Sequence, residues 1–170
     1  MIHTNEGSLA FQKYFVEHKS DPIVTDITYS GAELYEGSDE FMRAIAKSDV
    51  MVFCPSNPFL SIAPILALKD VREKIANFKG NRVVVSPIIG GRALKGPTAK
   101  ILKELGHEVS SFGVARMYQG ICDTFVLDNI DVEFKADIKK LGMDVCVTDT
   151  IMKSLDDKIG LARVILEISN

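Results

Sequence analysis

The sequence has few cysteines, and none is placed for a disulfide framework or a zinc site. Cys54, Cys122 and Cys146 are an odd number, are widely spaced and have no histidine close by. Cys54 and Cys146 lie in or beside short apolar runs, so we interpret the thiols as buried parts of a core. This use of cysteine fits a protein of the reducing cytoplasm.

The sequence also lacks a long apolar run and an excess of basic residues. No apolar stretch reaches the roughly 18 to 20 residues that a membrane-spanning helix needs. Residues 1–7, MIHTNEG, have neither the basic nor the apolar segment of a signal peptide. The formal net charge is −3, whereas a general nucleic-acid binder is usually basic. We therefore expect no membrane and no nucleic acid as partner.

Internal repeats and low-complexity segments are absent too, and the 170 residues predict one α/β domain, 1–170. Short apolar runs alternate with segments of helical periodicity, which indicates parallel βαβ units. We expect a three-layer α/β/α sandwich around a mainly parallel, Rossmann-like sheet. The predicted strands are 23–29, 50–54, 83–85, 124–127 and 145–147. The predicted helices include 8–18, 62–68, 97–105, 110–118, 132–141 and 156–168, and two more that are predicted to begin at the capping residues Ser38 and Asp70.

The stretch 82–98, RVVVSPIIGGRALKGPT, is the one around which we expect the chain to be organised. A buried strand leads into a loop with Gly90 and Gly91, and a helix follows whose first residue is predicted to be Pro97. Free backbone N–H groups, with Arg92 and Lys95 beside them, favour an anionic ligand such as a phosphate. The alternative is a tight turn that needs glycine only for steric reasons, because the spacing matches neither the Rossmann fingerprint nor the P-loop.

A second polar loop, 55–61, follows the strand predicted at 50–54. Ser56, Asn57 and Ser61 place small polar side chains there, and an asparagine amide can donate and accept hydrogen bonds. Two prolines make a rigid connection an equally good interpretation.

Aspartates follow the last two predicted strands. Asp128, Asp131 and Asp149 have the positions of metal-binding or base-reading carboxylates. The alternative for each is helix capping and turn formation, which explains Asp131 better. Because ligands of parallel sheets bind outside the carboxyl ends of the strands, we expect four loops to converge there: 55–61, 86–95, 128–131 and 148–150.

Two long motifs resemble the 2-phospho-L-lactate transferase family. They are Ser-Asn-Pro-x-x-Ser-Ile-x-Pro-Ile-Leu at 56–66 and Val-Ser-Pro-Ile-Ile-Gly-Gly-x-Ala-x-Lys-Gly-Pro at 85–97. Shorter similarities at 11–16, 113–118, 125–128 and 147–152 extend the resemblance over nearly the whole chain.

The resemblance implies an enzyme that moves a 2-phospho-L-lactyl (or enolpyruvyl-phosphate) group from a guanosine diphosphate-activated donor to FO, a riboflavin-like acceptor, in coenzyme F-420 biosynthesis. GMP is released, and magnesium neutralises the diphosphate. No general base is assigned. The residues that match the family motifs and are candidates for substrate contacts are Ser56, Asn57, Ser61, Ser86, Gly90, Gly91, Lys95 and Gly96.

Family chains begin with a Gly-Gly-Thr-Gly segment and with aspartates associated with metal and acceptor, and nothing here matches these. We therefore expect the carboxyl-terminal portion of a longer family chain, with no metal ligands of its own and with magnesium held by the amino-terminal half. An unpaired sheet edge then predicts a homo-oligomer or a partner chain. The alternatives are a noncatalytic guanine-nucleotide or phosphate-binding module and an assembly domain.

Overall fold

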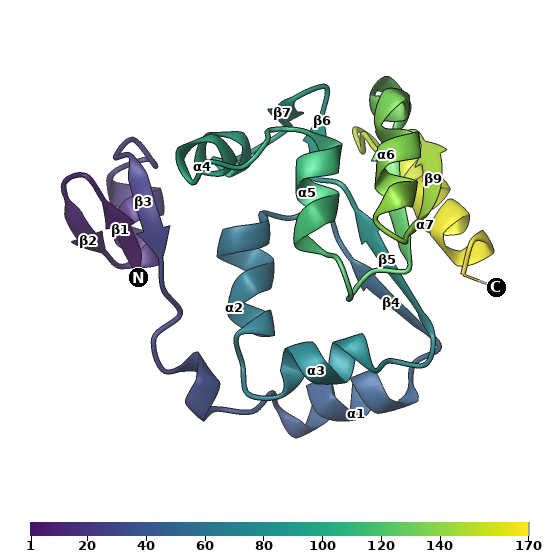
Figure 1. Cartoon of the computed structure of the whole chain (residues 1–170), viewed down its shortest axis with the longest axis horizontal. Helices are drawn as coiled ribbons and strands as arrows, with labels where there is room; N and C mark the ends of the chain where they lie inside the picture. The colour runs from purple at the N-terminus through teal and green to yellow at the C-terminus, as the bar shows by residue number, and fades with distance from the viewer. Residues whose placement is uncertain (170) are drawn as a thin grey trace.

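The computed structural model describes residues 1–169 and has a four-stranded parallel sheet at its centre (Figure 1). The strand order is β4-β5-β8-β9, with Val52 beside Val83, Val84 beside Phe125 and Val126 beside Cys146. The strands are β4 (Val50–Phe53), β5 (Asn81–Val85), β8 (Thr124–Asp128) and β9 (Asp144–Thr148). The predicted α/β class and parallel sheet are confirmed.

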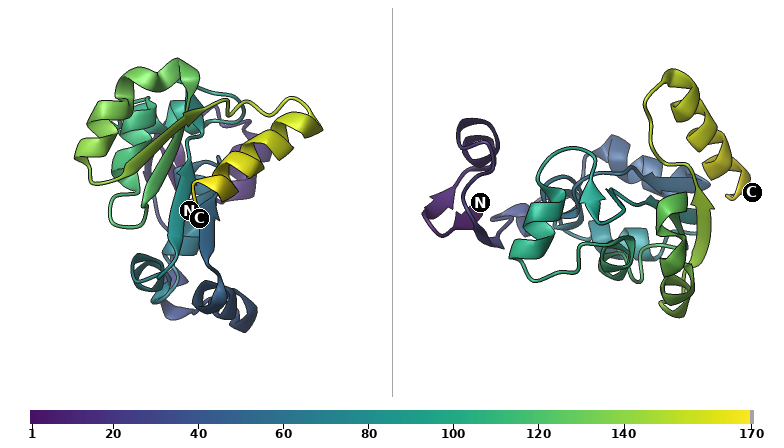
Figure 2. Two further views of the ribbon diagram at one scale, coloured as in Figure 1. Left: turned by 90° about the vertical axis from the view of Figure 1, so that its right-hand side faces the viewer. Right: turned by 90° about the horizontal axis from the view of Figure 1, so that it is seen from above.

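Helices cover both faces of this sheet, which explains why its central strands are apolar without alternation. On one face, Val83, Val85 and Val126 pack against Leu161 and Ile165 of α7 (Leu155–Glu167). Figure 2 shows α7 on the opposite side of the sheet from α5 and α6. The other face holds the larger core, with side chains from α3 (Val71–Ala76), α4 (Thr98–Glu104), α5 (Ser111–Met117) and α6 (Lys135–Lys140).

Serine side chains begin three of the helices, as expected of N-cap residues. Ser38 accepts a hydrogen bond from the backbone N–H of Phe41 at the start of α1 (Asp39–Lys47), and Ser110 does the same for α5. Ser154 and Asp157 form a capping box at the start of α7. The cap predicted at Asp70 is wrong, because this residue has φ +62° and its side chain caps nothing.

The amino-terminal segment forms a second, antiparallel sheet, of which the sequence analysis predicted only the strand at 23–29, confirmed as β3. It contains β1 (Ile2–Thr4), β2 (Gly7–Leu9) and β3 (Val24–Ile27) in the order β2-β1-β3. The helix predicted at 8–18 is wrong in its first part, because Leu9 pairs with Ile2 across a hairpin. Residues 11–17 remain helical, and Lys13–Glu17 among them form a π-helical turn. This sheet lies to one side of the parallel sheet (Figure 1), where the Lys100 ammonium donates to the Pro22 carbonyl at 2.8 Å.

Other elements differ from prediction in detail. A π-helical turn, Pro58–Ile62, precedes α2 (Ala63–Leu66), and a 3₁₀ helix, Asn129–Phe134, precedes α6. A further short 3₁₀ turn is Ala32–Leu34. The segment between β5 and α4 contains a small hairpin of β6 (Ile88–Ile89) and β7 (Arg92–Ala93).

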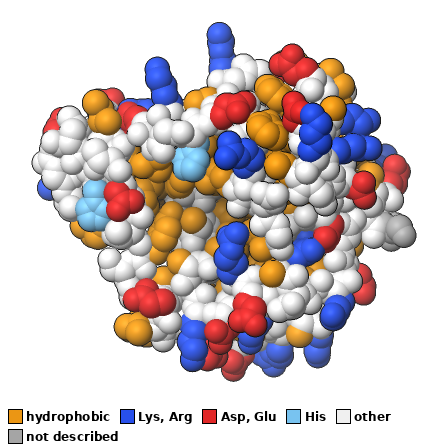
Figure 3. Space-filling view, viewed as in Figure 1, with side chains coloured by type: hydrophobic (Ala, Val, Ile, Leu, Met, Phe, Trp, Pro, Cys, Tyr) orange, Lys and Arg blue, Asp and Glu red, His pale blue; other side chains and the backbone are white. Residues whose placement is uncertain are grey.

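The cysteines are only partly buried, contrary to expectation. Cys122 lies in the core, and burial raises its pKa to about 12. Cys146 is half-buried, and Cys54 is exposed because it follows β4 at the uncovered edge of the sheet. Within residues 1–169, no helix is long and apolar enough to cross a membrane. Figure 3 shows hydrophobic side chains gathered in the centre of the viewed face, with most charged side chains around them.

An ion pair joins the amino ends of β5 and β8. The Arg82 guanidinium donates to the Asp123 carboxylate from Nε at 2.8 Å and from Nη2 at 2.5 Å, and to the Ala76 carbonyl at 2.8 Å. These hydrogen bonds from Arg82 hold the pKa of Asp123 below its usual value.

Asp123→Asn is expected to lower the free energy of unfolding by about 1–3 kcal/mol at pH 7, because charge-assisted hydrogen bonds are lost. The folded pKa of Asp123 lies below the unfolded value of about 3.9, so its contribution is complete above that value and is lost as the pH falls through the folded pKa. Urea unfolding of both proteins should therefore show a difference that shrinks below about pH 4. Asp137→Asn, which breaks an exposed pair with Lys140, is the control and should change little. A difference that persists undiminished at low pH would contradict this role.

Candidate functional site

A cleft of about 540 Å³ lies where the loops after β4, β5 and β9 meet. Three of the four loops predicted to converge contribute to its lining: 55–61, 86–95 and, through Thr150, 148–150. The fourth, 128–131, lies behind them. Phe11 and Phe15 of the amino-terminal segment and Lys158 of α7 complete the lining.

Six of the eight candidate residues line this cleft: Ser56, Asn57, Ser61, Ser86, Lys95 and Gly96. Gly90 and Gly91 do not, because they form the turn between β6 and β7 with φ +56° and +71°. Their positive φ values agree with the predicted need for glycine, but the turn explains them without a ligand.

Asn57 fits both interpretations of its loop, a rigid connection and a polar contact for a ligand. Its Oδ1 accepts hydrogen bonds from the backbone N–H groups of Phe59 at 2.9 Å and Leu60 at 3.1 Å, so it caps the π-helical turn that follows. Its Nδ2 is buried and has no hydrogen-bond partner among residues 1–169. A buried donor without a partner is costly, so a ligand oxygen in the cleft would relieve that cost.

The Ser86 hydroxyl is less available to a ligand than the sequence suggested. Its buried hydroxyl donates to the Ile88 carbonyl at 2.8 Å and accepts from the Ile88 N–H at 3.2 Å. Because a hydroxyl has a single hydrogen to donate, Ser86 has none left for a phosphate oxygen. Its role in the structure is to fix the turn after β5.

The charge of the cleft is one-sided. Lys95 and Lys158 line it, no aspartate or glutamate does, and neither lysine forms an ion pair within the described chain. Arg92, expected to add charge, lies in β7 and does not line the cleft. The helix α4 adds little positive charge, because it is a single short helix. Pro97 is its N-cap and not, as predicted, its first residue. Lysine side chains are therefore the cleft's source of positive charge.

Two buried carboxylates hold the loops around the cleft by hydrogen bonds. Asp128 accepts hydrogen bonds from the N–H of Thr150 at 2.9 Å and from its hydroxyl at 3.0 Å, and caps the following 3₁₀ helix through Ile130. Asp131 accepts from the N–H of Gly90 at 3.0 Å and from the Ser111 hydroxyl at 2.5 Å. The predicted role of Asp131 as a helix cap is therefore wrong. Asp131 instead links separate elements.

Asp149, the third candidate carboxylate, is used at the surface, where it accepts from the Asn129 side chain at 2.9 Å. Among residues 1–169, no three histidine, cysteine, aspartate or glutamate side chains lie together as metal ligands would.

Sequence reasoning missed Phe11, Phe15, Met152 and Lys158 as cleft residues. The two phenylalanines lie within the helix predicted at 8–18, and in the structure they are 40% and 43% exposed. Lys158 lies in a predicted helix far along the chain, and only the placement of α7 brings it to the cleft.

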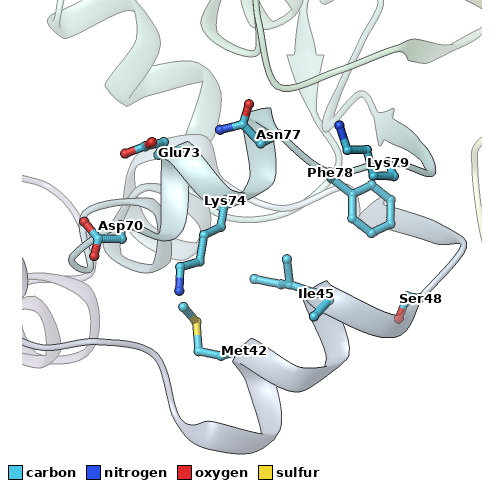
Figure 4. A pocket seen from close by; sticks show the side chains of 10 residues that line it. Met42, Ile45, Ser48, Asp70, Glu73, Lys74, Asn77, Phe78 and Lys79 are labelled. Carbon is cyan, nitrogen blue, oxygen red and sulfur yellow. The ribbon is translucent and has the colours of Figure 1, made fainter.

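Another hollow lies at the opposite end of the sheet, between α1 and α3. Figure 4 shows Lys74 pointing across it toward Met42, with Asp70 and Glu73 on the same rim. Its mixed charges and its distance from the carboxyl ends of the strands do not favour it as the site.

A family model described as 2-phospho-L-lactate transferase CofD matches residues 1–156 of the chain. The chain belongs to this family. It is 40% identical over 94% of its length to the 2-phospho-L-lactate transferase of Methanocaldococcus jannaschii, and 37% identical over 98% to that of Methanothermobacter thermautotrophicus. It covers 50% and 53% of these two proteins, so the chain spans about half the length of the curated relatives it matches.

The bracing role of Asp131 in this member of the transferase family can be tested by Asp131→Asn. The amide would turn a donor toward Gly90 or Ser111, so we expect a loss of about 1–3 kcal/mol in the free energy of unfolding. Asp137→Asn removes an exposed carboxylate of α6 and should be nearly neutral. Equal stability of the two variants in urea unfolding would show that the link does not matter.

Proposed function

We propose that the cleft holds the substrates of a 2-phospho-L-lactate transferase reaction. The donor is a guanosine diphosphate-activated 2-phospho-L-lactate or its enolpyruvyl counterpart, and the acceptor is FO, which leads to coenzyme F-420. A hydroxyl oxygen of FO forms a new bond to the phosphorus of the phospholactyl group. The bond from that phosphorus to the bridging oxygen breaks, GMP leaves with this oxygen, and the hydroxyl proton is released. A cytoplasmic location is part of this proposal.

The observation that carries the proposal is a cleft that contains Lys95 and Lys158 but, among residues 1–169, no acidic side chain in its lining and no ion-pair partner for either lysine. Lys95 and Lys158 offset the charge of a diphosphate, and the Asn57 amide nitrogen and the Ser56 and Ser61 hydroxyls can donate to its oxygens. Positioning of the two substrates and electrostatic stabilisation supply most of the catalysis in such transfers.

Magnesium does not fit the side chains that surround the cleft. Asp128 and Asp131 are buried behind it and already accept hydrogen bonds, and Asp149 is engaged by Asn129. We therefore derive no step through a metal held by these residues. We propose instead that the other half of the family chain supplies the magnesium ligands.

The open edge of the sheet is the place where we expect that other half to pair. β4 is an edge strand, and Val52 is 39% exposed although its neighbour Val83, on the same face, is completely buried under α7. Parallel sheets are normally covered on both faces. A further strand beside β4, followed by a helix over Val52, would complete the sheet, and a homo-oligomer could cover the same surface.

Lys95→Ala is expected to weaken GDP binding about tenfold, because a charge-assisted hydrogen bond to a phosphate is lost. Isothermal titration calorimetry of the chain measures this, and higher salt should weaken wild-type binding as well. Lys103→Ala removes an exposed lysine of α4 outside the cleft and should leave the affinity unchanged. Equal effects of the two variants would contradict a donor site at Lys95.

Transfer activity should require complementation. With FO, magnesium and the activated donor, we expect product only when a polypeptide carrying the remaining half of a family chain is added. Val52→Lys should abolish this gain by placing a charge in the new interface, whereas Val132→Lys, at another exposed valine that does not line the cleft, should not. Nucleotide binding without turnover under every complementation would instead favour a noncatalytic nucleotide-binding module.

A further inference from the structure

The helix α7 carries two apolar rows of side chains, and only one of them is covered. Leu161 and Ile165 form the first row and pack against valines of β5 and β8. The second row, which we call the α7 stripe, consists of Leu155, Ile159, Ala162 and Leu166. Leu155, Ile159 and Leu166 are 69%, 40% and 59% exposed, and Ala162 is exposed as well. Alternating steps of four and three residues are the spacing of a helix face that packs against another helix.

The fold keeps α7 from turning this stripe toward the core. A capping box of Ser154 and Asp157 fixes the start of the helix. At its end, the Asn81 side chain at the start of β5 donates from Nδ2 to the Ile168 carbonyl at 3.1 Å. The α7 stripe is therefore an exposed surface of a helix that is held at both ends.

The α7 stripe lies on the side of the helix that faces β4. Lys158 comes three residues after Leu155 and four before Ala162, so these side chains share one side of α7. Lys158 lines the cleft together with Ser56, which belongs to the loop after β4. On the face of the sheet that α7 covers, Val52 of β4 is 39% exposed. The stripe and Val52 thus border the same uncovered region of the sheet.

We infer that the α7 stripe is the docking seam for an amphipathic helix in the other half of the family chain. This inference rests on the proposed function, which places that half beside β4. A helix that covers Val52 must lie next to α7, because helices packed side by side have axes about 8–10 Å apart and neighbouring strands are about 5 Å apart. Its apolar side chains then fill the spaces between those of the stripe.

A second copy of the chain fits this surface less well. Two α7 helices packed against each other would bury the stripe, but they would supply no strand for the open edge of β4 and no cover for Val52. The chain covers 50% and 53% of two transferases of the family, so a family chain has enough further residues for both a strand and a helix. One partner can therefore complete the sheet and the helix layer together.

The test is a binding titration between the 170-residue chain and the half of the Methanocaldococcus jannaschii transferase that the chain does not match. We expect the double variant Ala162→Lys, Leu166→Lys to weaken the complex at least tenfold, because two charges would enter the seam. Val132→Lys, at an exposed valine outside α7, is the matched control and should bind as the wild type does. Alone, the variants should keep the wild-type urea midpoint, since they replace exposed side chains.

A fused polypeptide, with that half placed before this chain, provides a second measurement in which the two parts need not fold separately. The double variant should lower the urea midpoint of the fused protein and leave that of the 170-residue chain unchanged. Val132→Lys should change neither midpoint.

Three results would overturn the inference. Unchanged affinity in the double variant, with binding abolished by Val52→Lys, would confine the pairing to β4. A dimer of the chain alone that the double variant dissociates would assign the stripe to a second copy. No complex with the wild-type chain and no effect in the fused protein would remove the seam altogether. The GDP affinity and its dependence on Lys95 are measured on the chain alone, so they report separately on the proposed function.

Discussion

The arrangement of the cleft depends on two buried carboxylates at the end of β8. Asp128 holds the loop after β9 through Thr150, and Asp131 holds the β6–β7 turn and the start of α5 through Gly90 and Ser111. Each carboxylate joins segments that are far apart in the sequence. Because a buried donor without its acceptor costs about 1–3 kcal/mol, these links fix the loops rather than merely accompany them. Asp128 and Asp131 themselves do not line the cleft, whereas Lys95 and Lys158 do.

The central sheet and the location of the cleft could be predicted from the sequence, because both follow from local patterns. Runs such as Val83–Val85 are typical of strands buried on both faces, and ligands of parallel sheets bind at the carboxyl ends. The β1–β2 hairpin was missed because pairing of Leu9 with Ile2 outweighs the helical periodicity that follows. The roles of Asp131 and Lys158 depend on partners 20 or more residues away, and no local pattern records them.

The strand β4 lies at the edge of the sheet and is only partly covered. The sheet buries Val83 completely but leaves Val52, its neighbour on the same face, open. Exposed edge strands favour pairing with another strand. We propose that the residues for the donor phosphates lie within this chain and that the metal ligands lie in the segment that would complete the sheet.

The central proposal is that the cleft between the loops after β4 and β5 binds the diphosphate of the donor. An NMR titration of the 15N-labelled chain with GDP tests this proposal directly. GDP should shift the backbone amide signals around Ser56, Asn57 and Lys95. Shifts gathered at the hollow between α1 and α3 would contradict the proposal.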